Sequence, residues 1–399
     1  MTMTGEVRYA QLWKTFWSDE PQYDSINPEP SNLAKHIKTI EVNDSWLTGL
    51  ESNTPSPLPL LPGEDAAAAA ADGDEDEAPA STHKIRYIDL SNTIQTAFRH
   101  LSMDLTTPET KPAFIVREEY VEFFEHALKS AKAGKRRRYF VTGQPGIGKT
   151  YFSYYTICRV VATGISVFLI KEPPFAYYFS SEGVKKYSLV DLDASIEDLL
   201  ESSWVVVDFE PEWTLPEVLS NPRCLIWTSP PRKSRMDYME KKFAADVWYM
   251  RAWSTPEIAA ATTLRGLNHA AVFEAYELYG PVARDLLRIE EVDKQPEEVQ
   301  IRAIKNQIRN IIAQRNRFAI TEDSHELFLI QPQQLLKDKK CFWERSNYEA
   351  EFRSDRIAQL FAEEAQNHWE ENFAAVYNTS ASRLIAGKLF ETIIHSSIC

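Results

Sequence analysis

Residues 143–150, GQPGIGKT, match the pattern G-x-x-x-x-G-K-[ST] at every fixed position. In this pattern the glycines let successive backbone N–H groups turn toward a phosphate. We expect Lys149 to reach the β- and γ-phosphates and the Thr150 hydroxyl to bind Mg²⁺. A glycine-rich turn without a ligand would need neither side chain. The pattern therefore predicts a site for ATP and Mg²⁺ built from Gly143, Gln144, Pro145, Gly146, Ile147, Gly148, Lys149 and Thr150.

The segments around this loop predict the strand and the helix that it needs. YFVTG (139–143) is a short apolar run that ends in glycine, which is typical of a buried parallel strand. A helix expected from residue 149 onward would direct its positive N-terminal end at the same phosphates. A strand before the loop and a helix after it are the context in which this pattern binds a nucleotide.

An acidic residue follows a second buried strand, WVVV (204–207). We expect this residue, Asp208, to hold Mg²⁺ through water. Many hydrolysing enzymes of this type carry a water-activating glutamate directly after the aspartate, but Phe209 holds that place here. Glu210 is therefore either the catalytic base or a solvated loop acid, and the sequence leaves both interpretations open.

Polar side chains are also expected at the end of the next strand, RCLIWTS (223–229). In ATPases with an inserted strand between the phosphate-loop strand and the aspartate strand, this strand end offers a polar residue to the γ-phosphate or the attacking water. Thr228 or Ser229 stands there, and Ser229 is the catalytic candidate. Arg232 and Arg235 follow in a proline-containing loop, where they could neutralise charge in the transition state. A solvated basic loop is an equally good interpretation of each arginine taken alone.

A further arginine stands beyond the expected sheet, in ELYGPVARDLLRI (277–289). One helix ends at Gly280, and Arg284 would lie in the first turn of the next. A helical lid places an arginine on the γ-phosphate from this position. The alternative is a surface arginine that pairs with Asp285 or Glu277.

The middle of the chain alternates apolar runs with helical patterns. Amphipathic spacing predicts two leading helices at 87–101 and 118–131, and residues 171–195 look less regular. After the last strand, Ser254 and Glu257 have the spacing of a helix capping box. Alternating strands and helices predict a parallel sheet with helices on both faces. The expected strands are 139–143, 166–170, 203–209, 223–229 and 247–253.

Composition divides the chain into four regions. Residues 1–50 mix tryptophans and polar residues without a sustained period, which predicts a poorly packed N-terminal arm with one short helix. Residues 51–82 are rich in proline, alanine and acidic residues and lack aromatics, so we expect a disordered linker. Residues 83–253 form the P-loop core with its leading helices, and residues 254–399 form a helical lid and a C-terminal region.

Charge and apolar content exclude several classes of protein. The 399 residues carry 44 Lys+Arg and 58 Asp+Glu, and a net charge of −14 predicts no general attraction to nucleic acid. No apolar run approaches the roughly 18–20 residues of a membrane span, and no secretory signal is visible, so we expect an intracellular protein of the cytoplasm or nucleus. We expect neither a zinc site nor a disulfide framework, because the cysteines are far apart: Cys158, Cys224, Cys341 and Cys399.

The C-terminal region predicts helices and one extended segment. Residues 299–318 form an amphipathic helix whose basic residues could contact nucleic acid, although a solvated face is the more usual interpretation. Residues 325–332 predict a strand, and residues 352–377 a helix. A protein or nucleic-acid partner through this region and a homo-oligomer both stay open, whereas no membrane partner is expected.

The chain resembles the P-loop NTPase module of Crinkler–RHS (retrotransposon hot spot) type proteins, which are abundant in fungi. The resemblance spans residues 112–395 and is carried by PAFIVREEY (112–120), YFVTGQPGIGKTYFSYY (139–155), YYFSSEGV (177–184), WVVVDF (204–209), WTSPPRKSR (227–235), VWYMRAWSTPEI (247–258), YGPVARDLL (279–287), SHELFLIQP (324–332) and AGKLFETIIH (386–395).

The resemblance implies an ATPase of the additional-strand class, an α/β fold with sheet order 5-1-4-3-2. Lys149, Thr150 and Asp208 would bind ATP and Mg²⁺, and Arg284 would match the lid arginine of the family. The turn from Gly280 to Arg284 departs from the family's Gly-x-Pro-Arg spacing. Family members often join this module to a nuclease or a kinase-like domain, and this sequence shows no convincing nuclease motif.

We therefore expect a P-loop ATPase in which water attacks the γ-phosphate, assisted by Glu210 or another residue, and hydrolysis moves the helical C-terminal part. Two alternatives remain. The first is a nucleotide-gated binding module that does not hydrolyse ATP, which the displaced glutamate favours. The second is a P-loop kinase whose lid is the basic loop 232–235. Arg232 or Arg235 could also act on a neighbouring subunit of a ring.

Overall fold

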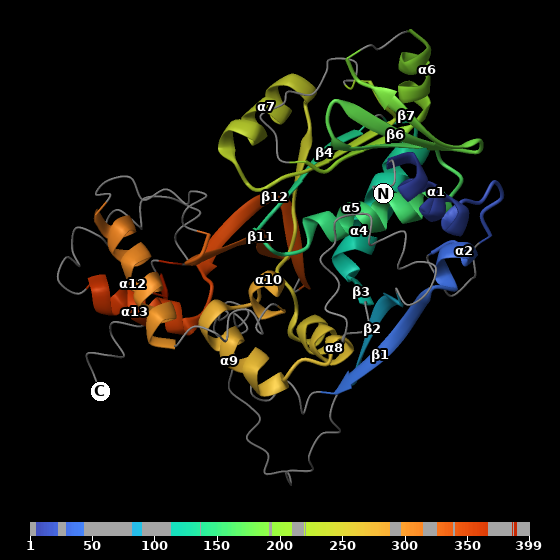
Figure 1. Cartoon of the computed structure of the whole chain (residues 1–399). Coiled ribbons are helices and arrows are strands. Elements are labelled where there is room, and N and C mark those ends of the chain that lie inside the picture. The colour runs from blue at the N-terminus through green and yellow to red at the C-terminus, as the bar shows by residue number, and fades with distance from the viewer. Residues whose placement is uncertain are drawn as a thin grey trace.

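The computed structural model describes residues 5–22, 29–43, 82–89, 113–135, 137–190, 194–209, 219, 221–287, 297–313, 325–337, 340–365, 385 and 387–388 (Figure 1). The expected acidic linker lies outside these residues, except for Thr82, which begins a strand. Glu210 also lies outside them.

A seven-stranded sheet forms the centre of the molecule, in the order β10-β4-β9-β8-β5-β6-β7. Its first five strands pair in parallel. They are β10 (Asp246–Tyr249), β4 (Arg137–Thr142), β9 (Cys224–Thr228), β8 (Trp204–Val207) and β5 (Val167–Glu172). Counted along the chain, these parallel strands stand in the order 5-1-4-3-2. Each of the five contains or overlaps a run that the sequence marks as a strand.

Two antiparallel strands extend this sheet where the sequence looked irregular. They are β6 (Phe175–Ser180) and β7 (Gly183–Ser188), joined by a two-residue turn. The expectation of an irregular segment is wrong here. Residues 176–180 of β6 are all buried, so this strand shows no polar alternation, whereas Lys185 and Lys186 of the edge strand β7 are exposed.

Helices cover both faces of the sheet, as predicted, because successive strand residues enter two separate cores. Val141 and Val206 enter the first core, together with α4 (Glu118–Lys132) and α5 (Lys149–Ala162). Their neighbours enter the second core, which α6 (Ala194–Ser202) and α7 (Lys233–Phe243) cover. A parallel strand buried on both faces reads as a continuous apolar run.

The N-terminal segment is well packed where the structure describes it, contrary to the expected arm. Helix α1 (Gly5–Phe16) buries Tyr9, Leu12 and Phe16 in the first core. The indole of Trp13 donates to the carbonyl oxygen of Ser180 over 2.8 Å, which ties α1 to β6. Tyr9, Leu12, Trp13 and Phe16 stand at i, i+3, i+4 and i+7, so a helical period is present here but extends over one short helix only.

A second sheet joins residues from both sides of the expected linker. It has the order β1-β2-β3, with β1 (Ile37–Asn43), β2 (Thr82–Asp89) and β3 (Ala113–Val116) paired antiparallel, and the short α2 (Ser31–Ala34) precedes it. The helix expected from residue 87 is wrong at its start, since residues 87–89 belong to β2. Residues 90–101 lie outside the described residues.

Beyond the sheet, helices predominate as expected: α8 (Thr255–Arg265), α9 (His269–Tyr279), α10 (Ala283–Leu286), α12 (Glu297–Ala313) and α13 (Asp355–Ala365). A long hairpin of β11 (Phe328–Lys337) and β12 (Lys340–Phe352) interrupts them. Figure 1 shows this hairpin between the central sheet and helices α12 and α13. Among the described helices, none combines the length and the apolar character needed to cross a membrane.

Candidate functional site

Residues 143–150, here called the phosphate loop, connect β4 to α5 at the carboxyl end of the parallel strands. Gly146 and Gly148 have φ angles of 90° and 100°, which side-chain-bearing residues rarely adopt. A Cβ atom on Gly148 would lie 2.5 Å from the Tyr120 hydroxyl, and one on Gly146 would lie 2.8 Å from Cβ of Arg284. Two of the glycines are therefore required by conformation and by close neighbours together.

Three carbonyl groups of the phosphate loop accept hydrogen bonds from outside it. The Tyr120 hydroxyl donates to the Gly148 oxygen (3.0 Å), and the Trp253 indole donates to the Ile147 oxygen (2.9 Å). The Arg284 amide donates to the Gly146 oxygen (3.3 Å). The N–H and C=O of one trans peptide point in opposite directions. The amides that follow Ile147 and Gly148 are therefore turned to the inner side of the loop, as an anion site requires.

Lys149 lies back over this loop. Its Nζ donates to the carbonyl oxygens of Gly143 (2.8 Å) and Gln144 (2.9 Å). Thr150 follows at the N-terminal end of α5, and its side chain is exposed. A cation over a turn of amides at a helix N-terminus concentrates positive potential at one point.

Asp208 stands directly after β8 and faces the phosphate loop. Its carboxylate accepts a hydrogen bond from the Thr228 hydroxyl (3.0 Å). Burial raises the pKa of Asp208 above its ordinary value, and the charge of Lys171, the Thr228 hydroxyl, the charge of Lys149 and the Thr150 hydroxyl oppose that rise. Asp208 and Thr150, the two residues that the sequence predicts to bind Mg²⁺, therefore lie next to each other.

Oxygen donors of this kind suit Mg²⁺, which usually keeps several waters and takes one or two carboxylates together with substrate phosphates. In the described part of the chain, no group of three or more His, Cys, Asp and Glu could hold a metal by itself. The hydroxyl of Thr150 and the carboxylate of Asp208 therefore fit an ion that arrives with a phosphate.

Lys171 is a charged neighbour of this site that the sequence analysis missed. It lies at the end of β5, next to β8 in the sheet. Its ammonium contacts the Tyr154 hydroxyl and lies 4.8 Å from the centre of that ring. Burial lowers the pKa of Lys171, while Asp208 and Glu172 oppose that change. The sequence did offer a signal for Lys171, which is a charged residue at the end of a buried parallel strand. The carboxyl ends of such strands meet at one edge of the sheet, so Lys171 could have been expected near Asp208.

The two polar residues at the end of β9 have different partners. Thr228 bonds Asp208 and also lies 3.1 Å from the Ser153 hydroxyl. Ser229 is buried and accepts a hydrogen bond from Nη1 of Arg235 over 2.6 Å. The structure therefore places Thr228, rather than Ser229, against the acidic residue.

The two arginines of the basic loop after β9 also differ from each other, in their burial. Arg235 is buried on its own chain, with its guanidinium on Ser229. Arg232 occupies the N-cap position of α7 and is half-buried. Of these two arginines, Arg232 is therefore the one that remains near the surface.

Arg284, at the start of α10, is brought to the phosphate loop. Its amide bonds the Gly146 oxygen, and its Cβ and Nε lie close to the point where a Gly146 side chain would be. The side chain is exposed. Asp285, which the alternative interpretation paired with Arg284, forms an ion pair with Arg353 instead.

Gln144 links the phosphate loop to the C-terminal hairpin. Its side chain is fully buried, and its Nε2 donates to the carbonyl oxygen of His325 (2.5 Å). Its Oε1 accepts from the amide of Ile330 in β11 (3.1 Å). The sequence pattern leaves this position open, so only the folded structure reveals the link.

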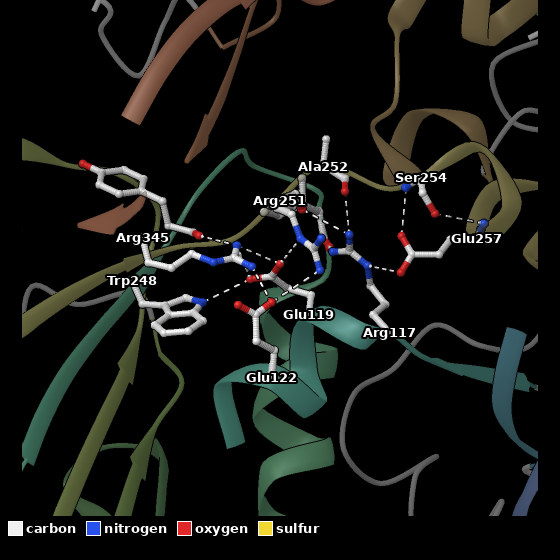
Figure 2. A network of polar contacts seen from close by, with 11 residues as sticks. Arg117, Glu119, Glu122, Trp248, Arg251, Ala252, Ser254, Glu257 and Arg345 are labelled. Atoms are coloured by element: carbon white, nitrogen blue, oxygen red, sulfur yellow. Dashed lines mark hydrogen bonds and ion pairs between the residues drawn. The ribbon is translucent and has the colours of Figure 1, made fainter. Parts of the chain in front are cut away.

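A set of charges centred on the buried Glu119 lies next to the loop, although Glu122 of the set is exposed. Figure 2 shows its members coming from the start of α4, the segment after β10, α8 and β12. Arg117 donates through Nε to Glu257 (3.1 Å) and through Nη1 to the Ile147 oxygen (3.4 Å). Glu257 also completes the predicted capping box, accepting from the Ser254 amide over 2.8 Å. We call this set the ion network, made of Arg117, Glu119, Glu122, Arg251, Glu257 and Arg345.

Glu119 is the centre of the ion network and is fully buried. It accepts hydrogen bonds from Trp248 (3.1 Å), Arg251 (2.7 Å) and Arg345 (2.9 Å). Burial alone would raise the pKa of Glu119, but Arg345, Arg251 and Arg117 outweigh it and hold the pKa below its ordinary value. The ion network thus fixes the loop, the last strand and the hairpin to one another.

The chain has curated relatives of low identity. It is 27% identical over 184 residues to Crinkler effector protein 15 of Phytophthora infestans, a match that covers 45% of this chain and 29% of that protein. Crinkler effector protein 16 of the same organism is 27% identical over 177 residues, 43% of this chain and 28% of that protein. This chain therefore spans less than a third of each relative. No family model matches it.

Solved structures with a similar course of the chain include RuvB and DnaA. A point mutant of RuvB from Thermotoga maritima is 13% identical, with a TM-score of 0.28, over 50% of this chain and 64% of that one. AMPPCP-bound DnaA from Aquifex aeolicus is 12% identical, with a TM-score of 0.33, over 74% of this chain and 93% of that one. TM-scores this low carry no argument about function, so a function can be proposed only from the geometry of the site.

Proposed function

We propose that the phosphate loop binds ATP with Mg²⁺ and that the chain is a P-loop NTPase of the additional-strand class. One observation carries the proposal: the carbonyls of Gly146, Ile147 and Gly148 accept hydrogen bonds from outside the loop, while Lys149, Thr150 and Asp208 lie close to one another at its inner side. This combination serves no evident purpose in a turn without a ligand. The parallel strand order and the 27% identity to Crinkler effector proteins agree with the resemblance to the Crinkler–RHS type module.

In this proposal the chain's own residues have distinct roles. Lys149 exchanges its two carbonyl contacts for the phosphates, and the loop amides bind the same oxygens. Thr150 and Asp208 hold Mg²⁺, which when bound neutralises phosphate charge. Arg284 reaches the phosphates from α10, and Arg232 can do so within the chain or from a neighbouring subunit. Glu210 stays the candidate base.

Coupling between the site and the C-terminal region follows from direct contacts. Gln144 bonds β11, and Arg284 brings α10 onto Gly146. Arg345 of β12 reaches Glu119 of α4, next to the loop's own supports. Occupation of the loop would therefore shift the hairpin and the lid helices.

A second candidate, nucleotide binding without hydrolysis, is favoured by the position after Asp208. Phe209 stacks on Trp227 with ring centres 6.1 Å apart and packs against the second core. The place that a water-activating glutamate often holds is thus taken by an apolar side chain. The kinase alternative has less support, because Arg235 of its expected lid loop is buried on Ser229.

Contacts of α12 offer little support for a nucleic-acid partner. Lys305 and Arg309 pair with Glu363 and Glu364 of α13 at distances of 2.6 to 3.6 Å. These ion pairs offset two of the five basic residues in residues 299–318.

The test is equilibrium binding of a fluorescent ATP analogue to the full chain, with phosphate release followed in parallel. Binding that needs Lys149 supports the P-loop assignment, and turnover that Glu210→Gln abolishes without loss of binding assigns the base. Tight binding without turnover in the wild type selects the second candidate. Equal binding by wild type and Lys149→Ala contradicts both.

A further inference from the structure

Lys171 and Asp208 are neighbours in the register of the central sheet. Ile170 pairs with Val207 across the parallel strands β5 and β8, so the next residues are Lys171 and Asp208. The Asp208 amide donates to the Ile170 oxygen over 3.0 Å, which continues the ladder to this point. Side chains at matched positions of adjacent strands leave the sheet on the same face. The two charges therefore lie side by side.

The side chain of Lys171 extends toward α5, below the phosphate loop. Its Nζ contacts the hydroxyl of Tyr154, whose side chain is fully buried. Tyr154 stands four residues after Thr150, one turn further along the same helix face. Asp208 thus has the Thr150 hydroxyl on the side of the loop and the Lys171 ammonium on the side of the core.

This position separates the roles of the two lysines near Asp208. Lys149 is bonded to the loop carbonyls and must turn to the phosphates when a nucleotide binds. Lys171 is bonded to Tyr154 of α5 instead, and the strand register places it beside Asp208. A partly buried carboxylate without a partner is costly, and outer partners of a metal-binding carboxylate fix its orientation.

We propose that Lys171 is a positioning residue that holds the carboxylate of Asp208 in place for Mg²⁺ in the nucleotide complex. The inference rests on the proposed function, because it concerns the metal of that site. Lys171 itself touches neither the metal nor the nucleotide. Its effect passes through Asp208.

The experiment measures binding of a fluorescent ATP analogue to the full chain while the Mg²⁺ concentration is varied and, separately, in EDTA. It compares wild type, Lys171→Met, Lys171→Arg, Asp208→Asn and the double variant Lys171→Met/Asp208→Asn. We expect Lys171→Met to need about tenfold more Mg²⁺ for half-maximal enhancement of binding, at the lower end of outer-partner effects. Binding in EDTA should be unchanged, and Lys171→Arg should recover most of the loss.

The double variant distinguishes positioning from a general structural role. If Lys171 acts through Asp208, the double variant behaves like Asp208→Asn alone. A wild-type Mg²⁺ requirement in Lys171→Met, or a full additional loss in the double variant, overturns the inference while nucleotide binding itself stands. Absence of binding in the wild type at every Mg²⁺ concentration overturns the proposed function and the inference together.

Discussion

The phosphate loop lies between two groups of charges that differ in balance. The ion network behind it contains three arginines and three glutamates, so its formal charge is 3 − 3 = 0. Lys149, Lys171 and Asp208, which lie together at the carboxyl end of the strands, carry a formal charge of 2 − 1 = +1, and the further acid nearby, Glu172, is exposed. A neutral set whose central residues, Glu119 and Arg117, are buried satisfies itself, whereas an uneven set at the edge of a sheet suits an anion. The comparison assigns the first group to stability and the second to binding.

The largest expected effect comes from breaking the neutral group. Glu119→Gln removes the acceptor charge shared by Arg251 and Arg345 and leaves both partly uncompensated. Loss of one partner of a buried pair costs about 3–5 kcal/mol, so the free energy of unfolding should fall by that amount in urea titrations. Glu118→Gln, at an exposed position of the same helix, is the matched control. A loss no greater than that of the control would contradict a stabilising role.

A second glutamate, Glu351, has a raised pKa, whereas the pKa of Glu119 is lowered. Burial and the charge of Glu349 raise the pKa of Glu351 to about 7, and Gln331 donates to it over 2.5 Å. The folded protein therefore holds the proton of the Glu351 carboxyl group more tightly than the unfolded chain does. The stability it contributes is complete below pH 4.5, the ordinary value, and is lost as the pH rises through about 7.

Glu351→Gln should remove this loss, because the amide mimics the protonated acid. At about pH 8 the variant should exceed the wild type by about 3 kcal/mol in the free energy of unfolding, and the two should converge near the ordinary pKa. Unfolding curves at several pH values measure this. Parallel pH profiles for the two proteins would show that Glu351 is not the group responsible.

Gly148 of the phosphate loop can be compared with Gly183, which begins β7. Gly148 and Gly183 have φ angles of 100° and 114°, but a Cβ meets Tyr120 at 2.5 Å only at Gly148 and has open space at Gly183. Alanine at either position should cost about 1–3 kcal/mol through backbone strain. Only Gly148→Ala should also abolish binding of the fluorescent ATP analogue. Loss of binding in both variants would mean that the contact with Tyr120 is irrelevant.

The smallest expected effect concerns the link from the loop to the hairpin. Gln144→Ala removes two hydrogen bonds to residues 325 and 330 and should cost about 1–2 kcal/mol. Hydrogen exchange should accelerate in β11 more than in β4 if Gln144 holds the hairpin. Gln359→Ala, at an exposed position of α13, is the control. Uniform exchange rates in Gln144→Ala and the control would remove this link from the account.

The parts of the site that the sequence predicted are local in the chain. GQPGIGKT carries its own turn chemistry, and Asp208 directly follows the apolar run that forms β8. The capping box of Ser254 and Glu257 also lies within one turn of helix. Such features depend on neighbours in sequence, which a pattern can read.

The parts that the sequence did not predict depend on distant partners. Arg345 reaches Glu119 across 226 positions, and β1 pairs with β2 across a long intervening segment. The proximity of Lys171 to Asp208 depends on the pairing of β5 with β8 in the sheet. The local sequence around these residues does not determine their partners, because the order of the strands in the sheet and the packing of distant segments do.

The central claim is that the positive group at the strand ends binds a nucleotide, and affinity for the fluorescent ATP analogue in Mg²⁺ tests it most directly. The wild type should bind, and Lys149→Ala should lose at least about tenfold in affinity, because it removes the charge that serves the phosphates. Lys132→Ala, at an exposed site on α4, should bind like the wild type. Equal affinity of the wild type and Lys149→Ala would contradict the account.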